Sequence, residues 1–235
     1  MLSGKLSSHR AVLFDLFGTL VPCYPLQSLS FTLCEMADDL GLAADQFLKE
    51  WTRTFPRRQR NEFASLSENI KLVLDELGYT RSMECVDAVA LKRIEFERIA
   101  LQPRPGTIDF LRSLRLNGLK IGIVSNCSME AIEAWDSSLL KPHVDHVTFS
   151  CLVGSEKPSP TIYNESCKSL SVVPTKCIFV GDGSNDELEG AMRTGMKSVL
   201  IRASDDDGSF PGRIDPGDWD GDFVSHVEEV AALLG

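Results

Sequence analysis

The stretch AVLFDLFGTLV, residues 11–21, organises this sequence. Its first four residues, 11–14, are a short apolar run that predicts a buried β-strand. The run ends in the carboxylate of Asp15, and α/β sheets carry their chemistry at the carboxyl ends of the strands. Gly18 in the following turn permits unusual backbone angles, and Thr19 brings a hydroxyl close to the acid. Asp15 is therefore either a candidate catalytic acid or an ordinary acid that caps the turn.

Size and composition restrict the class of protein. With 235 residues the chain can form one large α/β domain, or a core with a smaller second domain. Its hydrophobic content of 43% and charged content of 25% are typical of soluble globular proteins. A formal charge of −10 argues against binding to nucleic acid or to an anionic membrane, and no run is long enough to span a bilayer. A local basic pocket could still bind a small anionic substrate.

The seven cysteines are scattered, without a CxxC pair. This pattern indicates reduced thiols rather than a disulfide framework or a zinc site. The residues ahead of Asp15 contain no apolar segment of signal-peptide length. We therefore expect a cytoplasmic protein.

The chain contains two regions with different patterns of secondary structure. Residues 22–102 show helical periodicity throughout, whereas the prolines and glycine at 103–106 open a region in which strands and helices alternate. We expect an α/β fold with a parallel sheet covered on both faces, built from 1–21 and 103–235, and a helical block at 22–102 inserted after the first strand. The expected helices are 29–41, 43–55 (ending before Pro56), 65–78, 83–101, 107–118, 128–139, 159–170, 185–195 and 223–234. The expected strands after the first are 119–126, 144–150, 176–182 and 197–201, and 204–222 is expected to be an irregular surface loop.

Polar side chains follow four of the predicted strands or the loops after them. These are Asp15, Ser125–Asn126, Lys157, and the pair Asp182 and Asp186. In a parallel sheet the strand ends face one edge, so these groups should meet. Two carboxylates, a backbone carbonyl and waters suit Mg²⁺, and an ammonium with hydroxyl donors suits a phosphoryl group or another leaving anion. Asp15 would then be a nucleophile that forms a covalent aspartyl intermediate.

These motifs resemble those of the haloacid dehalogenase superfamily. The four family motifs are matched in order by DLFGT at 15–19, SN at 125–126, KP at 157–158 and GDGSND at 181–186. The resemblance covers nearly the whole chain, and the inserted helices resemble a type-one cap on a Rossmann-like core.

The resemblance implies a role for each matched residue. Asp15 would be the nucleophile, and Ser125 and Lys157 would hold the transferring group, with Thr19 and Asn126 as the remaining catalytic candidates. Asp182 would bind Mg²⁺ together with Asp15 and the backbone carbonyl of Phe17. Asp186 would steady Lys157 or a water on the metal.

The chain departs from the family phosphatases at Phe17. Those enzymes usually carry an acid–base Asp at this position, and losing such a group typically costs roughly 10² to 10⁴ in rate. L-2-haloacid dehalogenases instead have an aromatic residue here, since a halide leaves without protonation. They also lack an acid at the position of Asp182 and have Asn where this chain has Gly183. They carry an Arg directly after a Trp in the cap, whereas Thr52 follows Trp51 here.

Three functions are therefore open. An unpaired Asp182 beside Asp15 would cost several kcal/mol without a cation, which favours a Mg²⁺-dependent phosphatase acting on a small phosphomonoester. A 2-haloacid dehalogenase-type hydrolase is the alternative, and a catalytically weak ligand-binding protein is the third. The sequence specifies neither the substrate nor the oligomeric state.

The substrate contacts are expected to come from the loop after Asp15 and from the helical block. Phe17 and Gly18 are the candidates in the loop. The block carries a run of arginines that is most simply a solvated face, but Arg53 or Arg57 is the candidate to enter the pocket.

Overall fold

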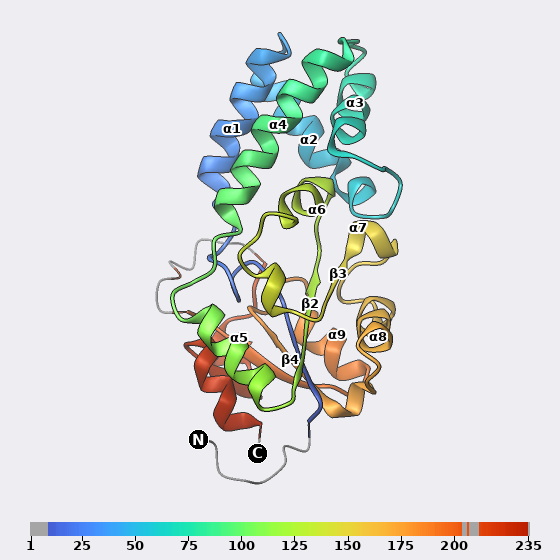
Figure 1. Cartoon of the computed structure of the whole chain (residues 1–235). Coiled ribbons are helices and arrows are strands. Elements are labelled where there is room, and N and C mark those ends of the chain that lie inside the picture. The colour runs from blue at the N-terminus through green and yellow to red at the C-terminus, as the bar shows by residue number, and fades with distance from the viewer. Residues whose placement is uncertain (1–8, 204–205, 207–211, 235) are drawn as a thin grey trace.

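The computed structural model describes residues 9–203, 206 and 212–234, and it contains a six-stranded sheet below a block of helices (Figure 1). The strand order is β3-β2-β1-β4-β5-β6, and every pairing is parallel. The central strand β1 lies between β2 and β4, which places the residue after it in the middle of the sheet edge. The strands are β1 Ala11–Phe14, β2 Lys120–Ser125, β3 His146–Phe149, β4 Cys177–Gly181, β5 Lys197–Ile201 and β6 Asp222–Val224.

The two faces of the sheet bury separate apolar clusters, because successive strand residues point to opposite sides. Val12 and Phe14 pack in the cluster that contains Phe110 of α5, whereas Leu13 packs in the cluster that contains Tyr163 of α8 and Leu188 of α9. Helices therefore cover both faces, and the predicted doubly wound α/β fold is confirmed. The helices of this part are α5 Thr107–Leu116, α6 Met129–Trp135, α7 Ser150–Val153, α8 Pro160–Ser169 and α9 Glu187–Arg193, with 3₁₀ turns η1 Lys141–His143, η2 Pro174–Lys176, η3 Pro216–Asp218 and η4 Val227–Leu233.

Four helices between β1 and α5 form a separate layer above the sheet edge, which we call the cap helices (Figure 1). Two of them have a serine cap at the N-terminus, since the Ser65 hydroxyl accepts from the Glu68 N–H and the Ser82 hydroxyl accepts from the Cys85 N–H. The apolar cluster on the α5 face of the sheet continues into this layer. The boundaries 22–102 for this layer stay a prediction. The cap helices are α1 Leu26–Asp39, α2 Ala44–Arg58, α3 Leu66–Glu76 and α4 Met83–Ala100.

Helix α6 joins the cap helices to the sheet. It packs against α3 and α4 and lies between them and the strands (Figure 1). Its Glu133 accepts a hydrogen bond of 2.6 Å from the Leu66 N–H at the start of α3. The helix that follows β2 in the chain is therefore in direct contact with the cap helices.

Two predicted helices differ in the structure. Helix α2 continues through Pro56 to Arg58, although proline deprives the Thr52 carbonyl of its helical donor. The last turn is held because Arg58 donates to the Trp51 carbonyl at 2.7 Å. The predicted helix 223–234 begins instead as β6, because Phe223 and Val224 extend the sheet beside β5 and only the following residues coil, as the 3₁₀ turn η4.

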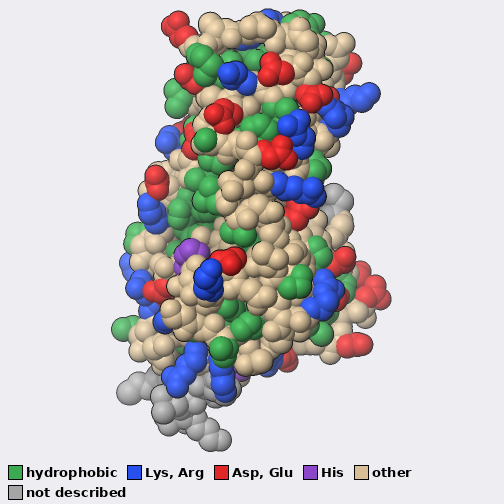
Figure 2. Space-filling view, turned by 90° about the vertical axis from the view of Figure 1, so that its right-hand side faces the viewer, with side chains coloured by type: hydrophobic (Ala, Val, Ile, Leu, Met, Phe, Trp, Pro, Cys, Tyr) green, Lys and Arg blue, Asp and Glu red, His purple; other side chains and the backbone are tan. Residues whose placement is uncertain are grey.

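The predictions about membrane spans, cysteines and surface charge can be compared with the structure. Within the described residues no helix is both long and apolar enough to cross a membrane. All seven cysteines are free thiols. On the face shown in Figure 2, acidic and basic side chains lie side by side over the upper half of the molecule rather than in one large patch of a single sign. Residues 204–205 and 207–211 of the predicted loop 204–222 lie outside the described residues.

Candidate active site

Asp15 stands at the middle of the sheet edge. Its backbone N–H donates to the Val180 carbonyl at 2.8 Å, and the Thr19 hydroxyl donates to its Oδ2 at 3.2 Å. Gly18 has a φ of +81°, and a Cβ there would lie 2.4 Å from Oδ2 of Asp182. The turn after β1 therefore needs glycine both for its backbone angle and for the close approach of the second carboxylate.

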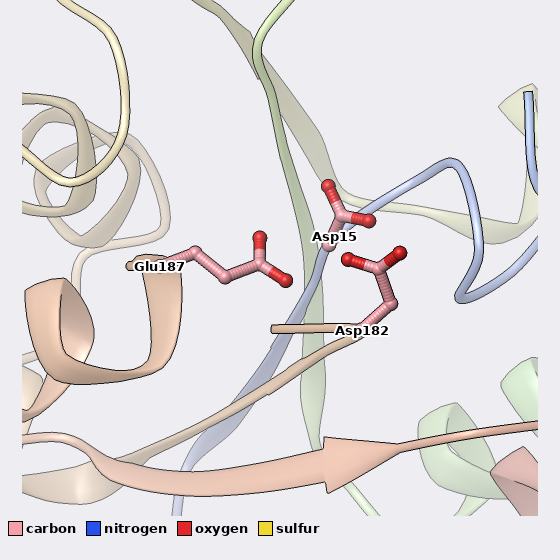
Figure 3. A group of neighbouring side chains, drawn as sticks. All are labelled: Asp15, Asp182 and Glu187. Carbon is pink, nitrogen blue, oxygen red and sulfur yellow. The ribbon is translucent and has the colours of Figure 1, made fainter. Parts of the chain in front are cut away.

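Three buried carboxylates converge at this edge: Asp15, Asp182 and Glu187 (Figure 3). One oxygen of each lies within 4.8 Å of the others. Burial raises the pKa of Asp15, although Lys157 opposes this, and burial together with Asp15 raises the pKa of Glu187 well above its ordinary value. So much negative charge in a buried place requires compensation by cations.

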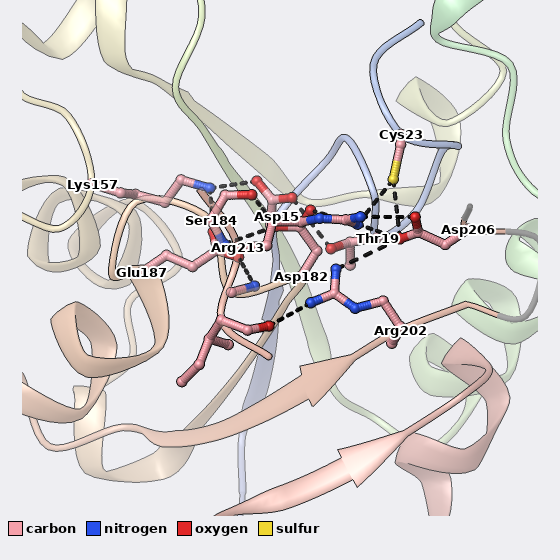
Figure 4. Close-up of polar contacts among 12 residues, drawn as sticks. Asp15, Thr19, Cys23, Lys157, Asp182, Ser184, Glu187, Arg202, Asp206 and Arg213 are labelled. Atoms are coloured by element: carbon pink, nitrogen blue, oxygen red, sulfur yellow. Dashed lines mark hydrogen bonds and ion pairs between the residues drawn. The ribbon is translucent and has the colours of Figure 1, made fainter. Parts of the chain in front are cut away.

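Lys157 provides part of that compensation. Its Nζ contacts Asp15 Oδ1 and donates to Glu187 Oε2 at 2.6 Å (Figure 4). Burial opposes its charged form, but the two carboxylates outweigh burial and raise the pKa of Lys157. The side chain of Asn126 fixes the lysine backbone, with Oδ1 accepting from the Lys157 N–H at 2.8 Å and Nδ2 donating to its carbonyl at 3.1 Å. Asn126 thus positions Lys157 from the loop after β2.

A second layer of charge lies behind Asp182. Arg213 pairs with both oxygens of Asp206, and its Nη1 also lies 3.5 Å from Asp182 Oδ2 (Figure 4). The thiol of Cys23 donates to Asp206 at 3.2 Å, and burial raises the pKa of Cys23 to about 12. Sequence patterns do not indicate Arg213, because it comes from the Asp- and Gly-rich segment that resembles plain surface.

The second acidic residue of the last motif differs from the expected one. Asp186 is exposed at the first position before α9, with a φ of 52°, and the carboxylate that contacts Lys157 belongs to its neighbour Glu187. The Tyr163 hydroxyl donates to the Glu187 carbonyl at 2.7 Å and so helps to orient this turn. The expectation that Asp186 steadies Lys157 is therefore corrected to Glu187. Asp186 lies instead along the wall of the cavity described next.

A cavity of about 730 Å³ lies between the cap helices and the strand ends. Asp15, Ser125 and Lys157 line its floor, and Phe17 lines it beside them. The cap helices and the start of α6 contribute most of the other walls. The remaining lining residues include Tyr24, Leu26, Leu29, Trp51, Phe55, Arg58, Gln59, Arg93, Glu97, Ser128, Glu130 and Glu156.

The arginines that line this cavity are not the expected ones. The side chains of Arg53 and Arg57 are 54% and 49% exposed and pair with the carboxylates of Glu50, Glu62 and Glu76. Arg58 and Arg93 line the cavity instead, and both are buried. The prediction that Arg53 or Arg57 enters the pocket is therefore replaced by these two residues.

Comparisons with known proteins find relatives that match most of this chain. The sequence-family model of the haloacid dehalogenase-like hydrolases matches residues 9–192 of this chain. The chain is 33% identical over 203 residues to the phosphatase MT3486 of Mycobacterium tuberculosis, covering 84% of this chain and 89% of that protein. It is 29% identical over 198 residues to a glyceraldehyde 3-phosphate phosphatase of Methanopyrus kandleri, covering 82% of this chain and 84% of that protein.

Solved structures share the fold. A haloacid dehalogenase-like phosphatase from Thermococcus onnurineus superposes with a TM-score of 0.64 at 24% identity, over 96% of this chain and 98% of that chain. The L-2-haloacid dehalogenase PA0810 superposes with a TM-score of 0.62 at 22% identity, over 97% of this chain and all of that chain.

Proposed function

Since this chain belongs to the haloacid dehalogenase-like hydrolases, we propose that it is a Mg²⁺-dependent phosphatase that hydrolyses a small phosphomonoester through a phosphorylated Asp15. The observation that carries this proposal is the buried cluster of Asp15, Asp182 and Glu187, in which Lys157 pairs with Asp15 and Glu187. Two relatives, each matched by this chain over most of its own length, are named as phosphatases, which supports the same chemistry.

The donor set fits Mg²⁺. Lys157 pairs with Asp15 and Glu187, while Arg213 makes its closer ion pair with Asp206 and only approaches Asp182, the third carboxylate. An excess of negative charge and hard oxygen donors is what a divalent magnesium ion prefers. We assign Asp15 and Asp182 as its carboxylate ligands, with the Phe17 carbonyl and Glu187 as further oxygens. When bound, the ion would neutralise charge on the phosphoryl oxygens.

The chain's own residues account for the transfer. The Asp15 carboxylate attacks phosphorus, a P–O bond to Asp15 forms, and the ester P–O bond breaks with its electron pair on the leaving oxygen. Because Phe17 has no proton to give, the leaving oxygen takes up a proton from water. Lys157, held by Asn126 and Glu187, faces the negative charge that develops on the phosphoryl group, and Ser125 and Thr19 supply hydroxyl donors. Water then attacks phosphorus, the P–O bond to Asp15 breaks, and inorganic phosphate leaves with the Asp15 carboxylate restored.

A dehalogenase reaction is the second candidate, because the Phe17 ring lines the cavity where the family phosphatases usually have an acid. In that reaction Asp15 would attack carbon and release halide. The third carboxylate makes this less favourable, since without a cation the cluster keeps an excess of negative charge. The free thiols and the acidic surface agree with a cytoplasmic protein that binds neither membranes nor nucleic acid.

The test is phosphate release from propyl phosphate and from p-nitrophenyl phosphate, with Mg²⁺ and with chelator, in wild type and Asp15→Asn. The proposal expects release that requires both Mg²⁺ and Asp15. Halide release from L-2-chloropropionate without phosphate release would replace it by the dehalogenase reaction. Loss of both activities, with Mg²⁺ still bound, would favour a ligand-binding protein.

A further inference from the structure

Five charged or polar residues form a buried group at the junction of the cap helices and the core, which we call the cap cluster. Arg93 of α4 donates to Glu97 Oε2 at 2.8 Å and to Glu130 Oε1, on α6, at 2.9 Å. The Tyr24 hydroxyl donates to Glu97 Oε2 at 2.6 Å and accepts from Arg93. Arg58 completes the group, 3.9 Å from Glu130. The cap cluster therefore contains two guanidinium groups and two carboxyl groups.

Some polar atoms of the cap cluster have no partner. Among the described residues, Nε of Arg58 and Nε of Arg93 are buried donors without a hydrogen bond. The hydrogen bonds that Glu97 accepts both end on Oε2, which leaves Oε1 as an acceptor without one in this part of the structure. The two Nε atoms have almost no accessible surface, whereas Glu97 Oε1 is not among the fully buried unpaired atoms of the described residues. Since Glu97 lines the cavity, its Oε1 is the acceptor that a ligand with a donor would satisfy.

The cap cluster faces the reacting groups across one cavity. All five of its residues line the cavity that Asp15 and Lys157 also line. The Tyr24 ring packs edge-on against the Phe17 ring, with centroids 4.6 Å apart, and Phe17 is two residues from the nucleophile. Low exposure does not remove the cluster from the cavity, because Asp15 and Lys157 are themselves only 7% and 4% exposed.

A chain segment limits how far Arg58 of the cap cluster lies from the phosphoryl site. Arg58 donates to the Ser128 hydroxyl at 3.1 Å, and Ser128 is three residues after Ser125 in the loop that follows β2. Three residues span at most about 11 Å. A leaving group of a few carbon atoms suits this separation.

We propose that the cap cluster is the leaving-group subsite, and that it selects phosphate esters of small uncharged polyhydroxy alcohols. This inference rests on the proposed phosphatase function. A hydroxyl group is both donor and acceptor, so it can donate to the free Glu97 Oε1 and accept from a guanidinium N–H of the cap cluster at once. A leaving-group carboxylate has no donor for Glu97, and an ammonium has no acceptor for Arg58 or Arg93. Because the cap cluster contains two guanidinium and two carboxyl groups, it also gives no preference for a leaving group of positive or negative charge.

The test compares three esters with the same three-carbon chain: glycerol 1-phosphate, propyl phosphate and 3-phosphoglycerate. Wild type should hydrolyse glycerol 1-phosphate with a kcat/KM higher than that of propyl phosphate by on the order of 10²-fold or more, because propyl phosphate leaves the polar atoms unpaired. It should also prefer glycerol 1-phosphate to 3-phosphoglycerate.

Two variants and their controls locate the preference. Glu97→Leu removes the free acceptor and should lower the ratio of glycerol 1-phosphate to propyl phosphate by on the order of tenfold or more. Tyr24→Phe removes only the hydroxyl that donates to Glu97, so the Glu97 carboxyl group is free to shift. This variant should lower the same ratio, and it keeps the aromatic contact with Phe17. The matched controls are Glu95→Leu, on the exposed side of α4, and Tyr79→Phe, an exposed cap tyrosine outside the cavity. Both should leave the ratio unchanged.

The outcomes separate this inference from the proposed function. Equal kcat/KM for glycerol 1-phosphate and propyl phosphate, both dependent on Asp15, would overturn the subsite and keep the phosphatase. A preference for 3-phosphoglycerate would also overturn it, in favour of a carboxylate subsite. If no ester is hydrolysed, calorimetry on wild type with 3,4-dihydroxybutylphosphonate and butylphosphonate still decides, because tighter binding of the hydroxylated phosphonate supports the subsite and equal binding refutes it.

Discussion

Replacing Arg93 by methionine should destabilise the protein strongly, because Arg93 holds together the cap helices and the core. Its guanidinium is 2% exposed and contacts Glu97 and Glu130, which are themselves 2% and 6% exposed. Removing one partner of a buried ion pair leaves an uncompensated charge and typically costs about 3–5 kcal/mol. For a chain of this size that loss corresponds to a fall in Tm of roughly 6–20 °C.

The matched control lies on the same helix. Arg98 pairs with Glu95 at 3.1 Å, but the two side chains are 45% and 62% exposed. An exposed pair contributes at most about 1 kcal/mol, so Arg98→Met should change Tm by only a few degrees. Urea unfolding of wild type and both variants at pH 7 measures the difference directly. Similar losses for the two variants would refute the reasoning.

The deficit of Arg93→Met should shrink as the pH falls. Burial alone would raise the pKa of Glu130, but Arg93 and Arg58 outweigh burial and lower it, whereas burial leaves the pKa of Glu97 raised. Without Arg93 both folded-state pKa values rise. The folded variant then takes up protons at a higher pH than wild type, so its stability relative to wild type increases on acidification toward the ordinary glutamate range of about 4.3. A deficit that stays constant between pH 7 and pH 5 would contradict this assignment.

Two further predictions concern the sheet edge. Glu187→Gln should lower kcat by roughly 10- to 100-fold, because a neutral glutamine cannot form the ion pair with Lys157. Glu189→Gln on the same helix should leave kcat unchanged. Equal effects of the two variants in phosphate-release assays would remove Glu187 from the site. Gly18→Ala should abolish the rise in Tm that Mg²⁺ produces in wild type, because the added Cβ would displace Asp182. The measurement is thermal unfolding at increasing Mg²⁺ concentration. A preserved rise in Tm would show that the close approach of Asp182 to Gly18 is not required.

Much of the sheet edge follows from the sequence by simple physical rules. Apolar runs of four to six residues predict β1, β2 and β4, and parallel pairing of these strands brings their carboxyl ends together. Asp15 and Ser125 can therefore be assigned to one edge from the amino-acid sequence alone. Lys157 and Asp182 follow from the order of the loops, and all four residues line or face the same site.

The choice between Asp186 and Glu187 depends on backbone angles that the sequence does not reveal. Asn185 and Asp186 both adopt positive φ, of 54° and 52°, and α9 begins only at Glu187. This tight turn leaves Asp186 exposed and directs Glu187 toward Lys157. Spacing alone fits either acid, although Gly181 offers a clue, because a Cβ there would lie 2.2 Å from Glu187 Oε1.

The cap cluster does not follow from the sequence, for a different reason. Arg58 and Arg93 lie in helices that carry many other charged residues, and the sequence shows no sign of which charges are buried. Arg58 also lies beyond the expected end of its helix at Pro56, whereas α2 continues to it. Which arginines reach the cavity is decided by how α2 and α4 pack against their neighbours, and that packing is a property of the whole fold.

The most direct test of the central claim is the detection of a phosphoryl group on Asp15. Wild type is mixed with a phosphomonoester and Mg²⁺, quenched in acid within one turnover, digested and analysed by mass spectrometry. The account predicts that the peptide containing Asp15 gains the mass of one phosphoryl group, and that Asp15→Asn abolishes the gain. Phosphate release without any modified peptide, or with the label on another residue, would contradict nucleophilic catalysis by Asp15.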